Sequence, residues 1–205
     1  MVELNKRIAN AQPDFSPLRT IMQLNQQVKH ITYHASKVYL TALNAMFMAR
    51  RVSSKTMAYT RVTTELRKFS HQMDTRMQEL SDRFSEMVYE IADCRKAMRR
   101  KKSMRLALNM VKISNSTRVA ELRMAYSGDN DNVETAFATM RQIIGNETKR
   151  LNDIIRIGQN LVVLSKVEAM QAEGYTEVLI DISRRIETRL DSIEYIVKEM
   201  QQKVA

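Results

Sequence analysis

The sequence predicts an all-α fold, an elongated antiparallel coiled coil or four-helix bundle. Two observations lead to it. The 205 residues include only four glycines, two prolines and no tryptophan, whereas helix-forming residues and 15 methionines are abundant. Apolar residues also recur at alternating steps of three and four over long stretches, the spacing of a helical seam.

The first helix is expected to begin at Ser16-Pro17, because serine can cap a free N–H group and proline fits the first helical position. Its apolar stripe runs without a slip through Ile21, Leu24, Val28, Ile31, Ala35, Val38, Ala42, Ala45, Ala49 and Val52. The later part of the stripe is mostly alanine, so partner helices should approach closely there.

A turn is expected at residues 52–57, where Ser53-Ser54 can cap the next helix. That helix carries the stripe Val62, Leu66, Phe69, Met73, Met77, Leu80, Phe84, Met87, Ile91, Cys94 and Met98. Unbroken to Tyr126 it would have about 70 residues and a length near 105 Å. Because its partner is much shorter, we expect a bend between Arg100 and Thr117.

The clearest loop is Ser127–Asp131, and Asp131 with Glu134 fits a capping box that opens a third helix. Its stripe is Val133, Phe137, Met140, Ile144, Leu151, Ile154 and Leu161, with an end near Gly174. A fourth helix would bury Val178, Ile182, Ile186, Ile193, Ile196 and Met200. The predicted organisation is a loose tail over 1–15, a hairpin over 16–126 and a second hairpin over 127–205 with its turn near 173–175.

The net charge of +10 favours acidic partners, namely nucleic acid, an anionic membrane surface or an acidic protein. Cys94 is the single cysteine, which excludes a disulfide within the chain. No secretory signal and no apolar run of about 18 residues is visible. We therefore expect a cytoplasmic protein.

The stretch around the predicted turn matches a known pattern without an insertion. The matching positions are Ala42-Leu43-Asn44-Ala45, Ala49, Arg51, Tyr59, Val62, Glu65, Arg67 and Lys68. Over about residues 38–70 the chain resembles the cytoplasmic signalling hairpin of bacterial chemoreceptors, the methyl-accepting chemotaxis proteins. The resemblance implies that the hairpin tip contacts partners through Asn44, Met48, Arg51, Ser53 and Lys55. Those partners would be the chemotaxis histidine kinase, the coupling protein or receptors, with a homodimer as a further assembly.

The tip also departs from the family pattern. Met48 stands where the family has a glutamate, and Ser53, Thr56 and Ala58 replace glycines. The resemblance therefore implies an accessory or decoy component of a chemosensory array. Gln78-Glu79 is the nearest counterpart of a methylation pair, with a solvated helix face as the plainer interpretation. A fainter echo of the tip lies at Val167-Glu168-Ala169 and Tyr175-Thr176, which would make the chain two hairpins imitating a receptor dimer.

The main alternative depends on the basic run Arg95, Lys96, Arg99, Arg100, Lys101, Lys102 and Arg105. These side chains could follow a phosphate backbone or an acidic membrane, and nucleic acid or acidic lipid would then be the partner. A structural coiled coil with an accidental resemblance is the third interpretation. His30 and His34 have metal-ligand spacing without a suitable third ligand, so surface histidines are preferred. No catalytic or cofactor motif is present, and we expect a protein that is not an enzyme and needs no cofactor.

Overall fold

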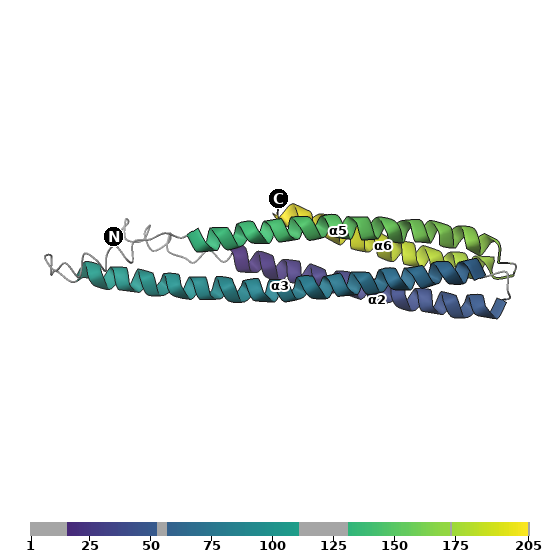
Figure 1. The fold of residues 1–205 in the computed structure, drawn as a ribbon, viewed down its shortest axis with the longest axis horizontal. Helices are drawn as coiled ribbons and strands as arrows, with labels where there is room; N and C mark the ends of the chain where they lie inside the picture. The colour runs from purple at the N-terminus through teal and green to yellow at the C-terminus, as the bar shows by residue number, and fades with distance from the viewer. Residues whose placement is uncertain (1–15, 53–56, 111–130, 173, 205) are drawn as a thin grey trace, which may run out of the picture. The chain divides into compact units, whose positions relative to one another are not determined.

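The computed structural model describes residues 16–52, 57–110, 131–172 and 174–204. They form four helices: α2 (Ser16–Val52), α3 (Met57–Met110), α5 (Asp131–Met170) and α6 (Thr176–Val204) (Figure 1). The all-α helical bundle is thereby confirmed. None of these helices combines the length and the apolar character that crossing a membrane requires.

The chain divides into two compact units. The four-helix unit comprises Leu24–Ser85 and Thr139–Ala205 and therefore holds parts of all four helices. The basic-run unit comprises Met1–Gln23 and Glu86–Ala138, and its described part includes the buried residues Ile21, Met87 and Ile91.

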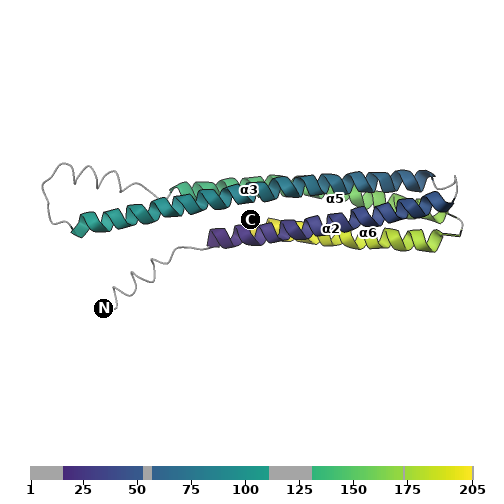
Figure 2. The same ribbon diagram turned by 90° about the horizontal axis from the view of Figure 1, so that it is seen from below.

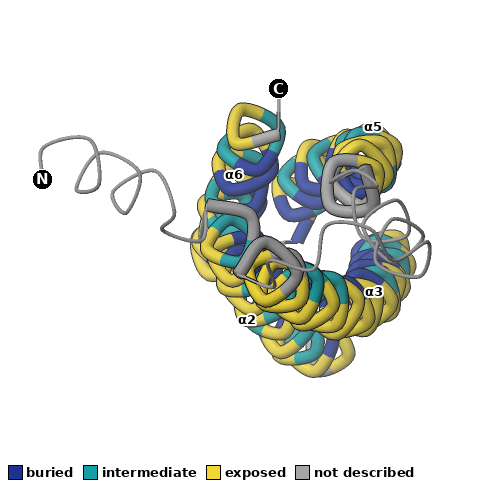
Figure 3. The backbone as a smooth tube through the Cα atoms, turned by 90° about the vertical axis from the view of Figure 1, so that its left-hand side faces the viewer, coloured by how far each residue is buried: buried dark blue, intermediate teal, exposed yellow. Residues whose placement is uncertain are grey.

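Within the four-helix unit α3 runs alongside α5 and α2 alongside α6 (Figure 2), and seen end-on the helices form a ring in the order α2, α3, α5, α6 (Figure 3). A specific contact joins each neighbouring pair: Ser70 to the Ala35 carbonyl for α2 and α3, Phe69 to Gly158 for α3 and α5, Lys166 to Glu187 for α5 and α6, and Gln27 to Glu199 for α6 and α2. Buried residues line the inside of the ring and exposed residues face outward (Figure 3). The core thus lies between two antiparallel hairpins, α2–α3 and α5–α6.

The alanine seam of α2 lies in this core, where Ala35, Ala42, Ala45 and Ala49 are fully buried. Glycine takes the corresponding role on α5. A Cβ built on Gly158 would lie 2.8 Å from Cε2 of Phe69, which is well inside carbon–carbon contact distance. Small residues therefore let the helices approach closely, as the sequence predicts for α2.

The two hairpins bury equivalent positions over most of the four-helix unit, the exceptions being Met46, Phe69, Ile182 and Ile196, which are buried where the counterpart is half-buried. Between residues 24 and 49, each buried position of α2 except Met46 has a buried counterpart 120 residues later in α5, from Leu24 and Ile144 to Ala49 and Ala169. The same offset relates α3 to α6 at seven buried pairs: Tyr59 and Leu179, Thr63 and Ser183, Leu66 and Ile186, Ser70 and Leu190, Met73 and Ile193, Met77 and Val197, and Leu80 and Met200. The four-helix unit is therefore a structural repeat of one hairpin. The sequence echo of Tyr59 at Tyr175 is wrong by one helical turn, since Leu179 occupies the equivalent place.

Four other predicted core positions are wrong because the adjacent residue is buried instead: Thr63 for Val62, Ile155 for Ile154, Val162 for Leu161 and Leu179 for Val178. In three of these pairs both neighbours are apolar, so the pattern alone does not distinguish them. α5 also ends at Met170, before the expected end near Gly174. Gly174 instead lies in the turn with a φ of 81°, a left-handed conformation that glycine adopts without strain. The described part of α3 is helical to Met110, and the rest of the expected bend region lies outside the described residues.

Candidate functional site

The predicted contact residues Asn44 and Met48 lie near the end of α2, at the end of the four-helix unit where α6 begins. Asn44 is exposed and Met48 is half-buried, and their spacing of four places them on one face of α2. Arg51 is the penultimate residue of α2, and its side chain is outside what the structure describes. Ser53 and Lys55 also fall outside the described residues.

A cluster of buried hydroxyl groups joins three helices at this end. The Tyr59 hydroxyl donates to the Leu179 carbonyl over 3.3 Å and lies 3.5 Å from Ser183 Oγ. Ser183 Oγ is in turn 2.5 Å from Ser165 Oγ and donates to the Leu179 carbonyl over 2.8 Å. Because a buried hydroxyl without a partner costs free energy, this cluster favours one arrangement of α3, α5 and α6. The tip is therefore held by polar contacts as well as by packing.

Both hairpins expose an apolar side chain at the same place near the tip. Phe47 on α2 is 51% exposed, and Val167 on α5, 120 residues later, is 49% exposed. The surface near the α5–α6 turn adds further exposed apolar residues: Val163, Leu164, Met170, Tyr175 and Val178. The sequence pattern did not predict this exposed apolar set, because the prediction considered only the apolar residues of the heptad stripe, which are expected to be buried. Apolar residues outside the heptad positions, as in Leu161–Leu164, are the signal that could have revealed it.

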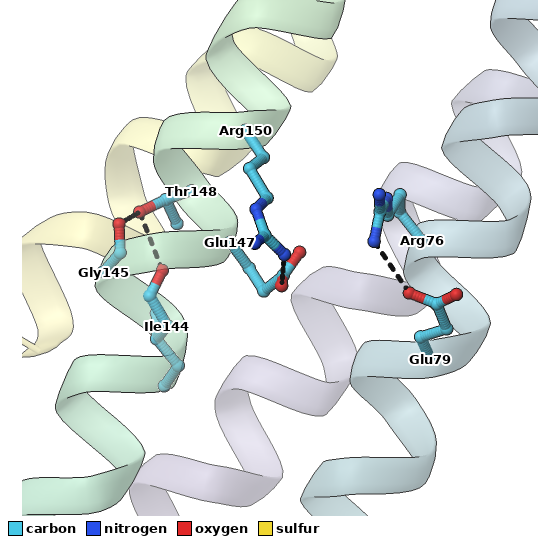
Figure 4. Close-up of polar contacts among 7 residues, drawn as sticks. All are labelled: Arg76, Glu79, Ile144, Gly145, Glu147, Thr148 and Arg150. Carbon is cyan, nitrogen blue, oxygen red and sulfur yellow. Dashed lines mark hydrogen bonds and ion pairs between the residues drawn. The ribbon is translucent and has the colours of Figure 1, made fainter.

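Polar contacts farther from the tip lie mostly within single helices. Arg76 pairs with Glu79 at 3.0 Å on α3, and Arg150 pairs with Glu147 at 2.9 Å on α5 (Figure 4). Both members of the Arg76–Glu79 pair face solvent in part, so this pair contributes roughly 0–1 kcal/mol to stability. Glu79, the candidate methylation residue, is therefore exposed and paired within its own helix.

The basic run lies on α3 within the basic-run unit. Lys96, Arg99, Arg100 and Lys102 are exposed, Arg95 and Lys101 are half-buried, and the Arg105 side chain is outside the described set. Successive helical residues are about 100° apart, so these charges are spread around the helix. The structure thus presents them to solvent without gathering them into one stripe.

The two histidines with metal-ligand spacing face other partners. His30 Nε2 lies 3.1 Å from Gln26 Nε2, and His34 Nδ1 lies 3.5 Å from Arg189 Nη1. Burial lowers the pKa of His34 below its ordinary value, and the positive charge of Arg189 and then His30 lower it further. Over the described residues no three side chains among His, Cys, Asp and Glu come together as a metal site would require.

One carboxylate at the α5–α6 contact is also perturbed. Lys198 and Gln159 donate hydrogen bonds to Glu194, and these bonds lower the pKa of that carboxyl. Glu194 is therefore a carboxylate stabilised in its charged form, and its hydrogen bond from Gln159 links α5 to α6.

The tip therefore presents exposed apolar side chains on helices that the buried hydroxyl groups of Tyr59, Ser165 and Ser183 join together. No protein-family model matches the chain, and no curated protein or solved structure is significantly similar to it.

Proposed function

We propose that the chain is a non-enzymatic interaction protein of the cytoplasm whose four-helix unit acts like a chemoreceptor signalling tip. It would be an accessory or decoy component of a chemosensory array. The observation that carries the proposal is the structural repeat. Two hairpins with the same buried positions pack side by side in one chain, which is the arrangement that two receptor hairpins make in a dimer.

The tip would bind its partner through exposed apolar anchors. Phe47 and Val167 occupy equivalent positions on the two hairpins, so the single chain presents two similar docking points. Because each side chain is already about half covered, burying the rest contributes about 1 kcal/mol, roughly half the value for a fully exposed side chain. Asn44 and Met48 lie close in sequence to Phe47 and supply a polar and a flexible contact.

The departure at Met48 favours an accessory role over a receptor role. In the resembling family a glutamate three residues before the arginine places a charge pair on one helix face. Here Arg51 keeps its charge, and the unbranched Met48 replaces the acid. The exchange removes an element of the receptor contact and leaves the frame of the hairpin intact.

A pull-down from a lysate treated with nuclease tests the proposal. Wild-type protein should retain the chemotaxis histidine kinase and the coupling protein. Arg51→Glu should reduce their capture far more than Arg100→Glu, which reverses a charge outside the tip. Equal effects of the two reversals, or no capture of these proteins by the wild type, would contradict the proposal.

The second candidate function is association with nucleic acid or an acidic lipid surface through the basic run. Its support is the exposure of Lys96, Arg99, Arg100 and Lys102, none of which joins an ion pair among the described residues. Such binding would weaken steeply with salt, because each phosphate contact releases counterions. Retention that nuclease abolishes and that depends on Arg100 rather than Arg51 would favour this function.

A further inference from the structure

A groove lined by long cationic side chains lies between α2 and α6 in the four-helix unit. Its volume is about 280 Å³, and its lining consists of Lys37, Thr41, Arg185, Thr188 and Arg189. Three of the five lining side chains are cations and none is a carboxylate. Lys37 and Arg189 are half-buried, whereas Arg185 is exposed.

The cations of this groove have no acidic partner within the described parts of the chain. None of the ion pairs there includes Lys37, Arg185 or Arg189. On α6, Glu187 pairs with Lys166 and Glu194 with Lys198, and neither Asp181 nor Asp191 forms an ion pair with a cation of the groove. The groove therefore holds uncompensated positive charge.

Neutral groups contact two of these cations without cancelling their charge. Lys37 Nζ lies 5.4 Å from the centre of the Tyr33 ring, and Arg189 points at His34. Both threonine hydroxyls donate to carbonyls of their own helices, Thr41 to Lys37 over 2.7 Å and Thr188 to Arg184 over 3.1 Å. A ligand in the groove would thus be recognised by its negative charge.

The equivalent contact in the other half of the repeat shows that packing does not require these cations. At an offset of 120 residues, Phe69 corresponds to Arg189, Ile157 to Lys37 and Leu161 to Thr41. On that side Phe69 is buried and fills the space against Gly158. The α2–α6 contact therefore has Arg189 where the α3–α5 contact has the buried ring of Phe69, and the exposed Ile157 and half-buried Leu161 take the places of Lys37 and Thr41. Like charges held close together destabilise a fold, and such local conflicts are expected where a protein binds something.

We propose that the groove binds a small phosphoryl oxyanion that carries several negative charges, such as a triphosphate chain. Two guanidinium groups four residues apart on α6 can each hold two oxygens of such a group, and Lys37 adds a point charge from α2. The volume fits a short phosphate chain. The source is either an inorganic polyphosphate or the phosphate chain of a nucleotide. This site is independent of the tip and does not depend on its proposed function.

Titration calorimetry of the full chain tests the site, with inorganic tripolyphosphate as the probe in a buffer free of phosphate. Arg185→Gln with Arg189→Gln should weaken binding about tenfold or more, because both guanidinium groups contact the anion. The matched control, Arg61→Gln with Arg83→Gln, removes the same charge from exposed positions of α3 outside the basic run and should change the affinity about twofold or less. Equal losses in the two double variants, or no binding at millimolar tripolyphosphate, would overturn the proposal.

A second readout is specific to the groove. A bound anion compensates the charge of Arg189 and should raise the pKa of His34, which Arg189 and His30 otherwise lower together with burial. Histidine resonances followed by NMR with and without tripolyphosphate measure this change, and an unchanged His34 titration in saturated protein would overturn the site. ATP as a second probe distinguishes the sources. Equal affinity identifies the phosphate chain as the recognised group, and about tenfold tighter binding of ATP identifies a nucleotide.

Discussion

Replacing Gly158 by alanine is the sharpest perturbation of the packing between the two hairpins. The added Cβ would lie 2.8 Å from Cε2 of Phe69 and 3.1 Å from its Cδ2 and Cζ. Phe69 is buried in the core, so its ring can move away only by displacing other core residues. We therefore expect α3 and α5 to be forced apart at this point.

Two opposing effects determine the size of the change in unfolding free energy. Alanine in place of glycine in a helix interior stabilises by roughly 0.5–1 kcal/mol. Over-packing of a core destabilises by roughly 1–3 kcal/mol. The second effect is the larger, so Gly158→Ala should lower the free energy of unfolding by about 1 kcal/mol.

Gly145→Ala is the matched control on the same helix. Nothing lies within 4 Å of a Cβ built at Gly145, so only the gain in helix propensity remains. Urea denaturation should show Gly145→Ala to be more stable than wild type by about 0.5–1 kcal/mol and Gly158→Ala to be less stable. If both variants gain stability equally, the close approach of α3 and α5 at Phe69 is refuted.

Two further predictions concern the hydroxyl cluster and His34. Tyr59→Phe removes the hydrogen bond to the Leu179 carbonyl and should lower the free energy of unfolding by about 0.5–1.5 kcal/mol in urea denaturation; an unchanged midpoint would contradict a role for the cluster. Burial, then Arg189 and His30, lower the pKa of His34, so the folded state prefers the neutral ring. The stabilisation that neutral His34 gives the folded state is fully present above the ordinary pKa of 6.5, and it is lost as the pH falls through the lowered pKa of the folded state. Between about pH 7.5 and about pH 5.5 the melting temperature of wild type should therefore fall more than that of His34→Gln; parallel curves would argue against this effect.

The seam of α2 could be predicted from the sequence residue by residue. From Leu24 to Ala49 every predicted member of the heptad stripe is buried, although other apolar residues such as Leu40 and Phe47 lie exposed beside it. The start of α2 at Ser16 likewise follows from local capping chemistry. Features that depend only on one helix are therefore readable in the sequence.

Features that depend on which helices pair could not be predicted in this way. Arg185 and Arg189 are ordinary surface cations of α6 until α2 places Lys37 across from them. The hydroxyl cluster unites residues as far apart as Tyr59 and Ser183. The sequence echo at Val167-Glu168-Ala169 has the offset of 120 residues that relates α2 to α5. For α6 the offset required the packing, because the echo at Tyr175 lies one helical turn from Leu179, the residue that takes the buried place of Tyr59.

The most direct measurement of the central claim is the affinity of the purified chain for the chemotaxis histidine kinase bound to the coupling protein. We predict that Phe47→Glu and Val167→Glu each weaken binding about tenfold or more, since each places a charge in an apolar contact. Ile157→Glu is the control, because Ile157 is equally exposed on α5 and lies about 15 Å along the helix from Val167. It should change the affinity about twofold or less. Equal affinities for the tip variants and the control would contradict docking through the tip.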